Sequence, residues 1–321
     1  MKQLEVTSGR ILAVYNEYST RAHLADQGVR RPLEDLGLSK GQVESHILRF
    51  PRVEDNIADL SELIREGDTI LSVGGDGTYH TVGNAALRAA LEGVRVGLVG
   101  YGNFNDGART FNQLEDLRNP LPLLDQNART VDVHPIETMI DNELWRQAFL
   151  YMSIGRTAEL AAIFNDPEVR SSLLSGESSM VKNFRRLISE YFRTRNDGYI
   201  PPFCHLGDDD TVHSNVTDVV NVNGPIMARF ARSGKDMHKT DAYIQSCLDI
   251  SRLYPNLPFI LKSLLGCMPG REIESDTMKF VDLSVVPLQA DGESDRRKGV
   301  GTIRLQKTPG APALQVITAK L

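Results

Sequence analysis

The segment Thr69-Ile70-Leu71-Ser72-Val73-Gly74-Gly75-Asp76-Gly77-Thr78 decides how the N-terminal part of the chain folds. Its first five residues are mostly β-branched or aliphatic, which predicts a buried strand. Three glycines follow within four positions, and glycine allows both a tight turn and a close approach of the backbone to a ligand. The segment therefore predicts a strand that runs into a ligand-binding turn at its carboxyl end.

Strands and helices alternate on either side of this segment. The expected strands cover residues 10–15, 46–50, 69–73 and 94–99, and the expected helices cover residues 53–65 and 84–91. Such alternation requires crossover connections, so it predicts a parallel sheet with helices on its faces. We therefore expect residues 1–127 to form a Rossmann-like α/β domain.

Residues 128–321 have a different pattern, in which short extended segments dominate. The expected strands cover residues 130–133, 148–154, 218–222, 278–286 and 301–305. Helical insertions are expected at residues 157–174 and 181–195, and a polar loop at residues 198–215. This half is expected to be an antiparallel, β-sandwich-like domain whose C-terminal segment can pack back on the first domain.

The composition is that of a globular protein. Hydrophobic residues make up 41% and charged residues 24% of the 321 positions, which argues against global disorder. The formal net charge of −6 gives no basic field that would attract nucleic acid. No apolar run approaches the roughly 20 residues that span a bilayer, and the first ten residues lack the apolar core of a signal peptide. We expect a cytoplasmic protein without a nucleic-acid partner.

The cysteines give no sign of a disulfide framework or a zinc ribbon, because Cys204, Cys247 and Cys267 show no CxxC spacing. A reducing cytoplasm fits this usage. One polar segment could hold a metal through Cys204, His205, Asp208, Asp209, Asp210 and His213. Their spacing matches no standard zinc pattern, so a solvated loop is favoured.

The glycine turn carries the strongest chemical signal. Exposed N–H groups in such a turn, followed by a helix N-terminus, form a concave site for phosphate oxygens. Asp76 stands beside this site, where a carboxylate would repel phosphate, so its placement indicates a proton acceptor or a metal contact. The alternative is a tight strand-to-helix turn in which Asp76 only caps the helix.

Four segments, in order, resemble one family. Residues 74–78 are similar to the GGDGT signature of the diacylglycerol kinase and sphingosine kinase catalytic-domain superfamily, which NAD kinases share. Residues 96–109, VGLVGYGNFNDGAR, align without a gap to the lipid-kinase pattern giiPlGTxNDfAR. Residues 289–293 resemble the DGE segment of the family, and residues 15–19 occupy the place of its NPxSG nucleotide loop. The match at residues 96–109 favours a lipid kinase over an NAD kinase.

The resemblance implies transfer of the γ-phosphoryl group from Mg²⁺-ATP to a lipid alcohol such as diacylglycerol or a sphingoid base. Asp76 would be the catalytic residue, orienting the hydroxyl and accepting its proton. No metal ligand is identified. The residues expected to bind the nucleotide are Asn16, Gly74, Gly75, Gly77, Thr78, Gly102, Asn103, Asn105, Asp106, Asp291, Gly292 and Glu293.

The sequence also departs from the family pattern. The residues that replace its usual proline, glycine, threonine and phenylalanine are Glu17, Thr20, Gly100, Asn103 and Gly107. Backbone N–H groups can still cradle phosphate, whereas the adenine contacts and the acceptor pocket change. Two alternatives therefore stay open: an NAD kinase-like enzyme that phosphorylates a ribose hydroxyl, and a non-catalytic lipid- or nucleotide-binding protein.

Two further segments bear on lipid contact. Residues 181–195 predict a basic amphipathic helix, which could rest on anionic lipid at the inner membrane face or direct an arginine to ATP; packing on the second domain is favoured. Residues 257–268, LPFILKSLLGCM, are apolar enough to contact an acyl chain, although core burial explains them equally well. A peripheral membrane location and a homodimer are both compatible with the sequence.

Overall fold

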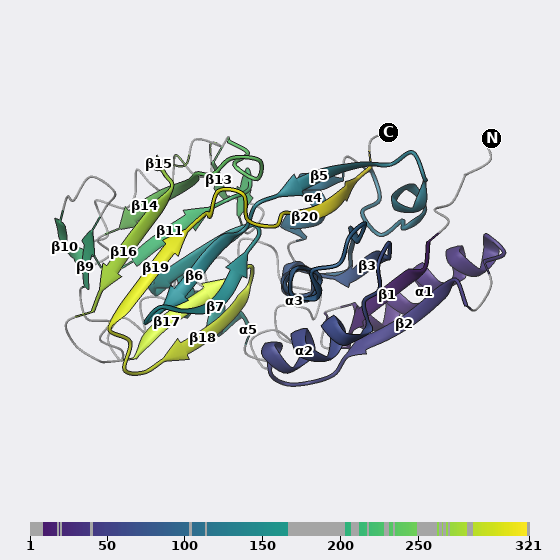
Figure 1. The fold of residues 1–321 in the computed structure, drawn as a ribbon, viewed down its shortest axis with the longest axis horizontal. Helices are drawn as coiled ribbons and strands as arrows, with labels where there is room; N and C mark the ends of the chain where they lie inside the picture. Colours follow the sequence, from purple (N-terminus) through teal and green to yellow (C-terminus); the bar gives the residue numbers. More distant parts are fainter. Residues whose placement is uncertain are drawn as a thin grey trace, which may run out of the picture.

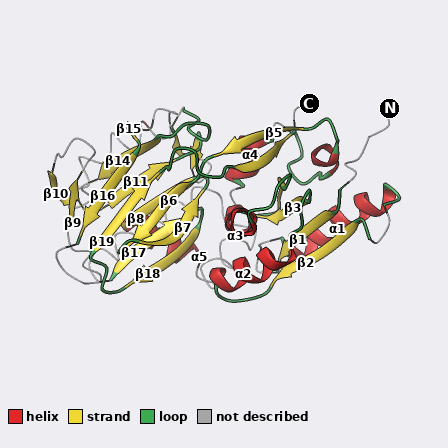
Figure 2. Cartoon of the chain, in the orientation of Figure 1, coloured by secondary structure: helices red, strands yellow, loops and turns green. Residues whose placement is uncertain are grey.

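The computed structural model shows two lobes side by side, one built around a parallel sheet with helices and one built of antiparallel strands (Figures 1 and 2). It describes residues 9–17, 19, 21–38, 41–102, 105–112, 114–165, 203–206, 212–216, 218–227, 231–233, 235–248, 262, 265, 268, 270–280 and 285–319. No helix in this part of the chain is both long and apolar enough to cross a bilayer.

The first sheet has six strands in the order β2-β1-β3-β4-β20-β5. They are β1 (Ile11–Asn16), β2 (Val43–Leu48), β3 (Thr69–Gly74), β4 (Arg95–Gly100), β5 (Arg129–Val133) and β20 (Leu314–Thr318). Neighbours from β2 to β20 pair in parallel, and β5 pairs antiparallel with β20. The expected parallel sheet is confirmed, and the C-terminal strand β20 lies within it.

Helices cover both faces of this sheet. They are α1 (Ala22–Asp35), α2 (Val53–Leu63), α3 (Asp76–Ala89), α4 (Asp106–Phe111) and the short 3-10 helix η1 (Leu121–Leu124). Successive residues of a strand point to opposite faces, so Ile70 packs in the core with α2 and α3, while Leu71 packs with α1 and η1. Burial of β3 on both faces explains why the segment that opens the glycine turn is almost continuously apolar.

The second lobe contains two six-stranded antiparallel sheets, in the orders β10-β9-β16-β19-β6-β7 and β15-β14-β11-β8-β17-β18. One apolar core receives side chains from both, including Ile136 and Ile303 from the first and Met152, Val219 and Leu288 from the second. Two sheets that share a core form a sandwich, as expected. The strands are β6 (Ile136–Ile140), β7 (Glu143–Ala148), β8 (Tyr151–Gly155), β9 (Phe203–Leu206), β10 (Val212–Val216), β11 (Asp218–Val222), β14 (Tyr243–Leu248), β15 (Arg271–Ile273), β16 (Ser275–Lys279), β17 (Val286–Ala290), β18 (Glu293–Arg297) and β19 (Thr302–Gln306).

Three smaller elements belong to the described part of this lobe. Helix α5 (Arg156–Asn165) follows β8 and packs against β17 and β18. A small two-stranded sheet pairs β12 (Ile226–Met227) with β13 (Ala231–Arg232). The remainder of the insertion expected at residues 157–174, the basic helix expected at 181–195 and most of the apolar segment 257–268 lie outside the described residues.

Several expected boundaries were wrong. Helix α3 begins at Asp76 rather than residue 84, because the glycine turn itself supplies the first helical turn, with Gly75 at the N-cap. Residues 198–215, expected as a loop, contain β9 and β10, since β9 pairs with both β10 and β16. The single strands expected at 148–154 and 278–286 are each parts of two strands. A polar segment can form a strand when its backbone N–H and C=O groups pair with neighbouring strands. Such a segment lacks the alternation of apolar and polar residues by which strands are recognised in a sequence.

Candidate active site

The two glycine turns that follow β3 and β4 touch each other. The carbonyl oxygen of Gly74 accepts hydrogen bonds from the N–H groups of Tyr101 and Gly102, at 2.8 and 3.0 Å. A Cβ atom added to Gly102 would lie only 2.3 Å from the Cα of Gly75. The turns are thus joined through their backbones, at a spacing that glycine alone permits.

Asn105 fixes the second turn. It has a left-handed backbone, with φ of 55°, at the N-cap of α4. Its side-chain Oδ1 accepts from the N–H of Gly102 at 2.8 Å, and its Nδ2 donates to the carbonyl of Gly102 at 3.0 Å. Asn105, expected to bind the nucleotide, therefore holds the shape of the turn, while Asn103 lies outside the described residues.

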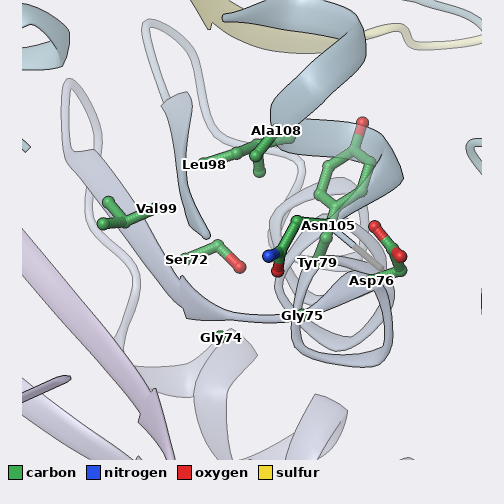
Figure 3. Close-up of a pocket in the computed structure, with 9 residues that line it drawn as sticks. All are labelled: Ser72, Gly74, Gly75, Asp76, Tyr79, Leu98, Val99, Asn105 and Ala108. Carbon is green, nitrogen blue, oxygen red and sulfur yellow. The ribbon is translucent and has the colours of Figure 1, made fainter. Parts of the chain in front are cut away.

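Asp76 is the first residue of α3 and lies where the two turns meet. It is 8% exposed, and its Oδ1 accepts a hydrogen bond from the N–H of Gly107, in the first turn of α4, at 3.0 Å. A small cavity lies beside it, and Figure 3 shows Ser72 and Asn105 pointing toward one another there. The cavity lining consists of Ser72, Gly74, Gly75, Asp76, Tyr79, Leu98, Val99, Asn105 and Ala108.

Burial and a neighbouring acid change the proton affinity of Asp76. Burial raises its pKa most, the negative charge of Asp106 raises it further, and the N–H of Gly107 opposes both; the resulting pKa is about 8. Asp106 is itself completely buried at the start of α4. Asp76 and Asp106 thus form an acidic centre in which the raised pKa favours the uncharged, protonated form of Asp76 at neutral pH.

The hairpin between β17 and β18 reaches this centre from the second lobe. Asp291 and Gly292 form its two-residue turn, both with left-handed φ values, of 49° and 92°. A Cβ atom on Gly77 would lie 2.0 Å from Oε1 of Glu293, so this carboxylate rests directly against the first turn of α3. The structure thus brings Gly77 and Glu293 together.

Asp291 is placed differently from its neighbour. It is fully buried, and its two oxygens accept hydrogen bonds from the N–H groups of Phe149, Leu150 and Tyr151 at 2.7 to 3.0 Å. Its Oδ2 also lies 3.2 Å from Nδ1 of His80 in α3. Its carboxylate is directed at the β7–β8 turn and at α3 rather than at an open cleft.

The remaining predicted residues lie around the same turns. Thr78 packs its buried side chain against Gly74, where a Cβ would lie 2.2 Å from the threonine Oγ1. Asn16 ends β1, and its carbonyl accepts the N–H of Ser19 at 3.0 Å. Ser19 Oγ in turn donates to the carbonyl of Tyr101 at 3.2 Å, so the first loop contacts the second glycine turn.

A divalent cation has a limited choice of ligands here. Among the described residues no three His, Cys, Asp or Glu side chains converge on a metal position. The oxygens of Asp291 already accept hydrogen bonds from backbone N–H groups. Asp76 and Asp106 lie close together, and the negative charge of Asp106 makes ionisation of Asp76 less favourable. One or two carboxylates completed by substrate phosphates are the usual ligands of Mg²⁺, so this pair fits that ion.

Two residues of the interface between the lobes have no sequence signal that identifies them. His80 lies one helical turn after Asp76, and a single histidine on a helix is usually an ordinary core residue. Arg146 lies in β7 with 6% exposure and donates to Glu54 in α2 at 2.7 Å. Only the packing of the lobes shows that these side chains contact residues of the opposite lobe.

A protein-family model matches the part of the chain that contains both glycine turns. Residues 10–136 match the family model of the diacylglycerol kinase catalytic domain. No curated protein matches the chain.

Solved structures resemble the chain along nearly its whole length. A diacylglycerol kinase from Bacillus anthracis str. Sterne shares 15% identity and a TM-score of 0.61, covering 99% of this chain and 98% of that one. A candidate diacylglycerol kinase of the same organism gives 15% identity and a TM-score of 0.63, covering 97% and 98%. At this identity the likeness shows the fold alone. The match to the diacylglycerol kinase catalytic domain covers residues 10–136, which form most of the first lobe.

Proposed function

We propose that the chain is an ATP-dependent kinase that transfers the γ-phosphoryl group to the hydroxyl of a lipid alcohol, such as diacylglycerol or a sphingoid base. The observation that carries the proposal is the position of Asp76, a buried acid at the junction of two glycine turns. The family match over residues 10–136 supports the same reaction class.

Asp76 has the protonation chemistry of a general base. With a pKa of about 8, its ionised form is a much stronger proton acceptor than an ordinary carboxylate, and this pKa lies near neutral pH, where a general base works best. In the proposed reaction the alcohol oxygen attacks the γ-phosphorus, the bond from phosphorus to the bridging oxygen of ADP breaks, and Asp76 accepts the hydroxyl proton as the new bond forms. Phosphoryl transfer depends mainly on positioning and charge neutralisation, which the surrounding turns would supply.

The glycine turns would hold the triphosphate through backbone N–H groups of Gly74, Gly75, Gly77, Thr78 and Gly102. Asn16, at the end of β1, would contact the nucleotide from the first loop. Asn103 and Gly292 would also bind the nucleotide.

Asp106 would hold Mg²⁺, which neutralises phosphate charge when bound. Glu293 would approach the nucleotide from the second lobe, because its carboxylate already rests against Gly77. Asp291, also proposed at the sequence level as a nucleotide contact, would act by holding the hairpin that carries Glu293.

The second lobe would bind the acceptor. A lipid alcohol resides in a membrane, so we propose that the protein works at the membrane surface. We place the division between the nucleotide and acceptor domains near residues 127/128, although β5 and β20 complete the first sheet from beyond it.

The test is a transfer assay with γ-labelled Mg²⁺-ATP and mixed vesicles containing diacylglycerol or sphingosine, with NAD as a separate acceptor. Label should pass to a lipid with the native protein and not with Asp76→Asn. Label on NAD would favour the ribose kinase alternative. Tight ATP binding without transfer to any acceptor would favour a non-catalytic protein.

A further inference from the structure

Arg146 is a buried cation that the proposed chemistry leaves unused. Its Nη2 donates to Oε1 of Glu54 at 2.7 Å, and its guanidinium lies 4.7 Å from the centre of the Trp145 ring. Its Nε and Nη1 atoms are buried and find no hydrogen-bond partner among the described residues. Buried donors are almost always paired in folded proteins, so three N–H groups without an acceptor indicate that a ligand supplies one.

The neighbours of Arg146 place it at the interface between the lobes. The next residue, Gln147, exchanges two hydrogen bonds with the side chain of Asn84 in α3, at 3.0 and 3.2 Å. On its other side, Glu54 belongs to the first turn of α2, which follows the carboxyl end of β2. Carboxyl ends of parallel strands meet at one edge of a sheet, so Glu54, the partner of Arg146, lies along the edge that also carries the glycine turn at Gly74.

The electrostatics of the pair agree with access from this edge. Burial raises the pKa of Glu54, but the hydrogen bond and charge of Arg146 outweigh burial and lower it overall. Arg297, in β18, contributes in the same direction. The side chain of Glu54 is 39% exposed, so the pair lies at the boundary between protein and solvent rather than deep in a core.

We propose that Arg146 is a phosphate-binding residue that the second lobe contributes to the nucleotide site, a role that rests on the proposed function. Its Nε and Nη1 groups donate to phosphate oxygens of the bound nucleotide, while Nη2 keeps its hydrogen bond to Glu54. Guanidinium presents its donors in a planar fork that matches phosphate oxygens, and a lysine ammonium does not. A ligand held in this way links the two lobes.

Isothermal titration of Mg²⁺-ATP, Mg²⁺-ADP and adenosine into native protein and variants tests the assignment. Arg146→Ala should weaken ATP binding by about 10- to 100-fold, as expected for hydrogen bonds to a charged group, and Arg146→Lys should recover only part of it. Adenosine should bind all variants equally. Glu54→Gln removes the same ion pair but keeps the guanidinium, so its ATP affinity should stay within about threefold of native.

The contrary results are distinct. Equal losses in Arg146→Ala and Glu54→Gln, or an equal loss for adenosine and ATP, would show that Arg146 only shapes the interface. Native ATP affinity in both Arg146→Ala and Arg146→Lys would overturn the assignment while leaving the kinase proposal intact. Absence of ATP binding by the native protein would overturn both. Thermal melting of each variant checks that it is folded.

Discussion

At the scale of single residues, two buried aspartates of similar sequence context have opposite surroundings. Asp76 has one backbone donor, from Gly107, and a like-charged neighbour in Asp106, so its neutral form is favoured. Asp291 has three backbone donors, from residues 149–151, and the ring of His80. The first arrangement suits a group that gains and loses a proton, and the second suits a group that holds the structure.

Asp76→Asn separates catalysis from stability. Turnover should fall by about 10²- to 10⁴-fold, the range for loss of a general base. The pKa of Asp76 is about 8 in the folded chain against 3.8 for the free group, so folding favours its proton. The free energy of unfolding therefore decreases as pH rises from about 4 to about 8, and asparagine removes this decrease.

Urea unfolding of native protein and Asp76→Asn across this range measures the effect. The variant should be more stable than native near about pH 8, and the difference should shrink toward about pH 4. A variant that is equally active, or whose stability follows the native pH dependence, would contradict the role given to Asp76.

Asp291→Asn tests the structural role of the second aspartate. An amide places an N–H₂ group where the carboxylate accepts N–H donors, so we expect a loss of at least about 2 kcal/mol in the free energy of unfolding. Glu293→Gln, two residues along the same hairpin, should be nearly as stable as native. If Asp291→Asn is fully stable but fails to bind ATP, Asp291 is a nucleotide ligand instead.

At the scale of elements, α3 connects the proposed chemistry to the second lobe. Its first residue is Asp76, and the face that follows presents Gly77 to Glu293, His80 to Asp291 and Asn84 to Gln147. These contacts recur at helical spacing, so one side of a single helix forms much of the interface. Any movement of the lobes would be transmitted to Asp76 through this helix.

The contact between the glycine turns gives a sharp prediction at this scale. Gly102→Ala places a Cβ 2.3 Å from the Cα of Gly75, so the two turns must separate. We expect a loss of about 1 to 3 kcal/mol in stability, typical of overpacking, together with at least about tenfold weaker binding of ATP. Calorimetric melting and ATP titration measure the two effects.

Gly41→Ala is the matched control, because a Cβ there meets nothing within 4 Å and its φ is not left-handed. It should have native stability and native affinity. A Gly102→Ala protein that binds ATP as the control does would show that the turns do not act together.

At the scale of the whole molecule, the chain enters the second lobe after β5 and returns to the first sheet through β20. Lys307 lies on the return path, just after β19, and is 3% exposed. Its Nζ donates to the carbonyls of Met237 and Thr240 at 2.6 and 2.9 Å. Burial lowers the pKa of Lys307 to about 7, although the charges of Asp241 and Asp236 oppose the change.

This buried lysine should make stability depend on pH. Its pKa is lower in the folded chain than the ordinary 10.5, so the unfolded chain binds the proton more tightly. Lys307 therefore makes the free energy of unfolding rise with pH above about 7, and its contribution is lost as pH falls through that value. Lys307→Met should be less stable by about 1 to 3 kcal/mol, because two carbonyls lose their donor, and should lack this rise.

Urea unfolding between about pH 8 and about pH 9.5 measures how steeply the free energy of unfolding rises with pH. Asp76 lowers this free energy as pH rises, but only below about pH 8, so it does not interfere in this range. Higher pH is avoided because burial raises the pKa of Tyr79 and Tyr151 well above 10, and both oppose folding once the unfolded chain ionises. Equal slopes for native protein and Lys307→Met would remove Lys307 as the cause.

The parallel sheet, the two-lobe organisation and the meeting of the glycine turns follow from the sequence alone. These features depend on local rules: β3 is an apolar run buried on both faces, and Gly74, Gly75 and Gly102 permit turns that other residues do not. Parallel strands also bring their carboxyl ends to one edge of the sheet. The sequence therefore predicts that residues from the turns after β3 and β4 lie close together.

The groups of the second lobe that meet that edge, and the burial that raises the pKa of Asp76, follow only from the tertiary structure. A short motif predicts that Asp291 contacts the nucleotide, yet its oxygens accept hydrogen bonds from the N–H groups of Phe149, Leu150 and Tyr151, which are about 140 residues away in sequence. His80 and Arg146 gain their places only when the lobes pack. Burial, long-range hydrogen bonds and charge proximity set proton affinity, and none of these is encoded in the spacing of a local motif.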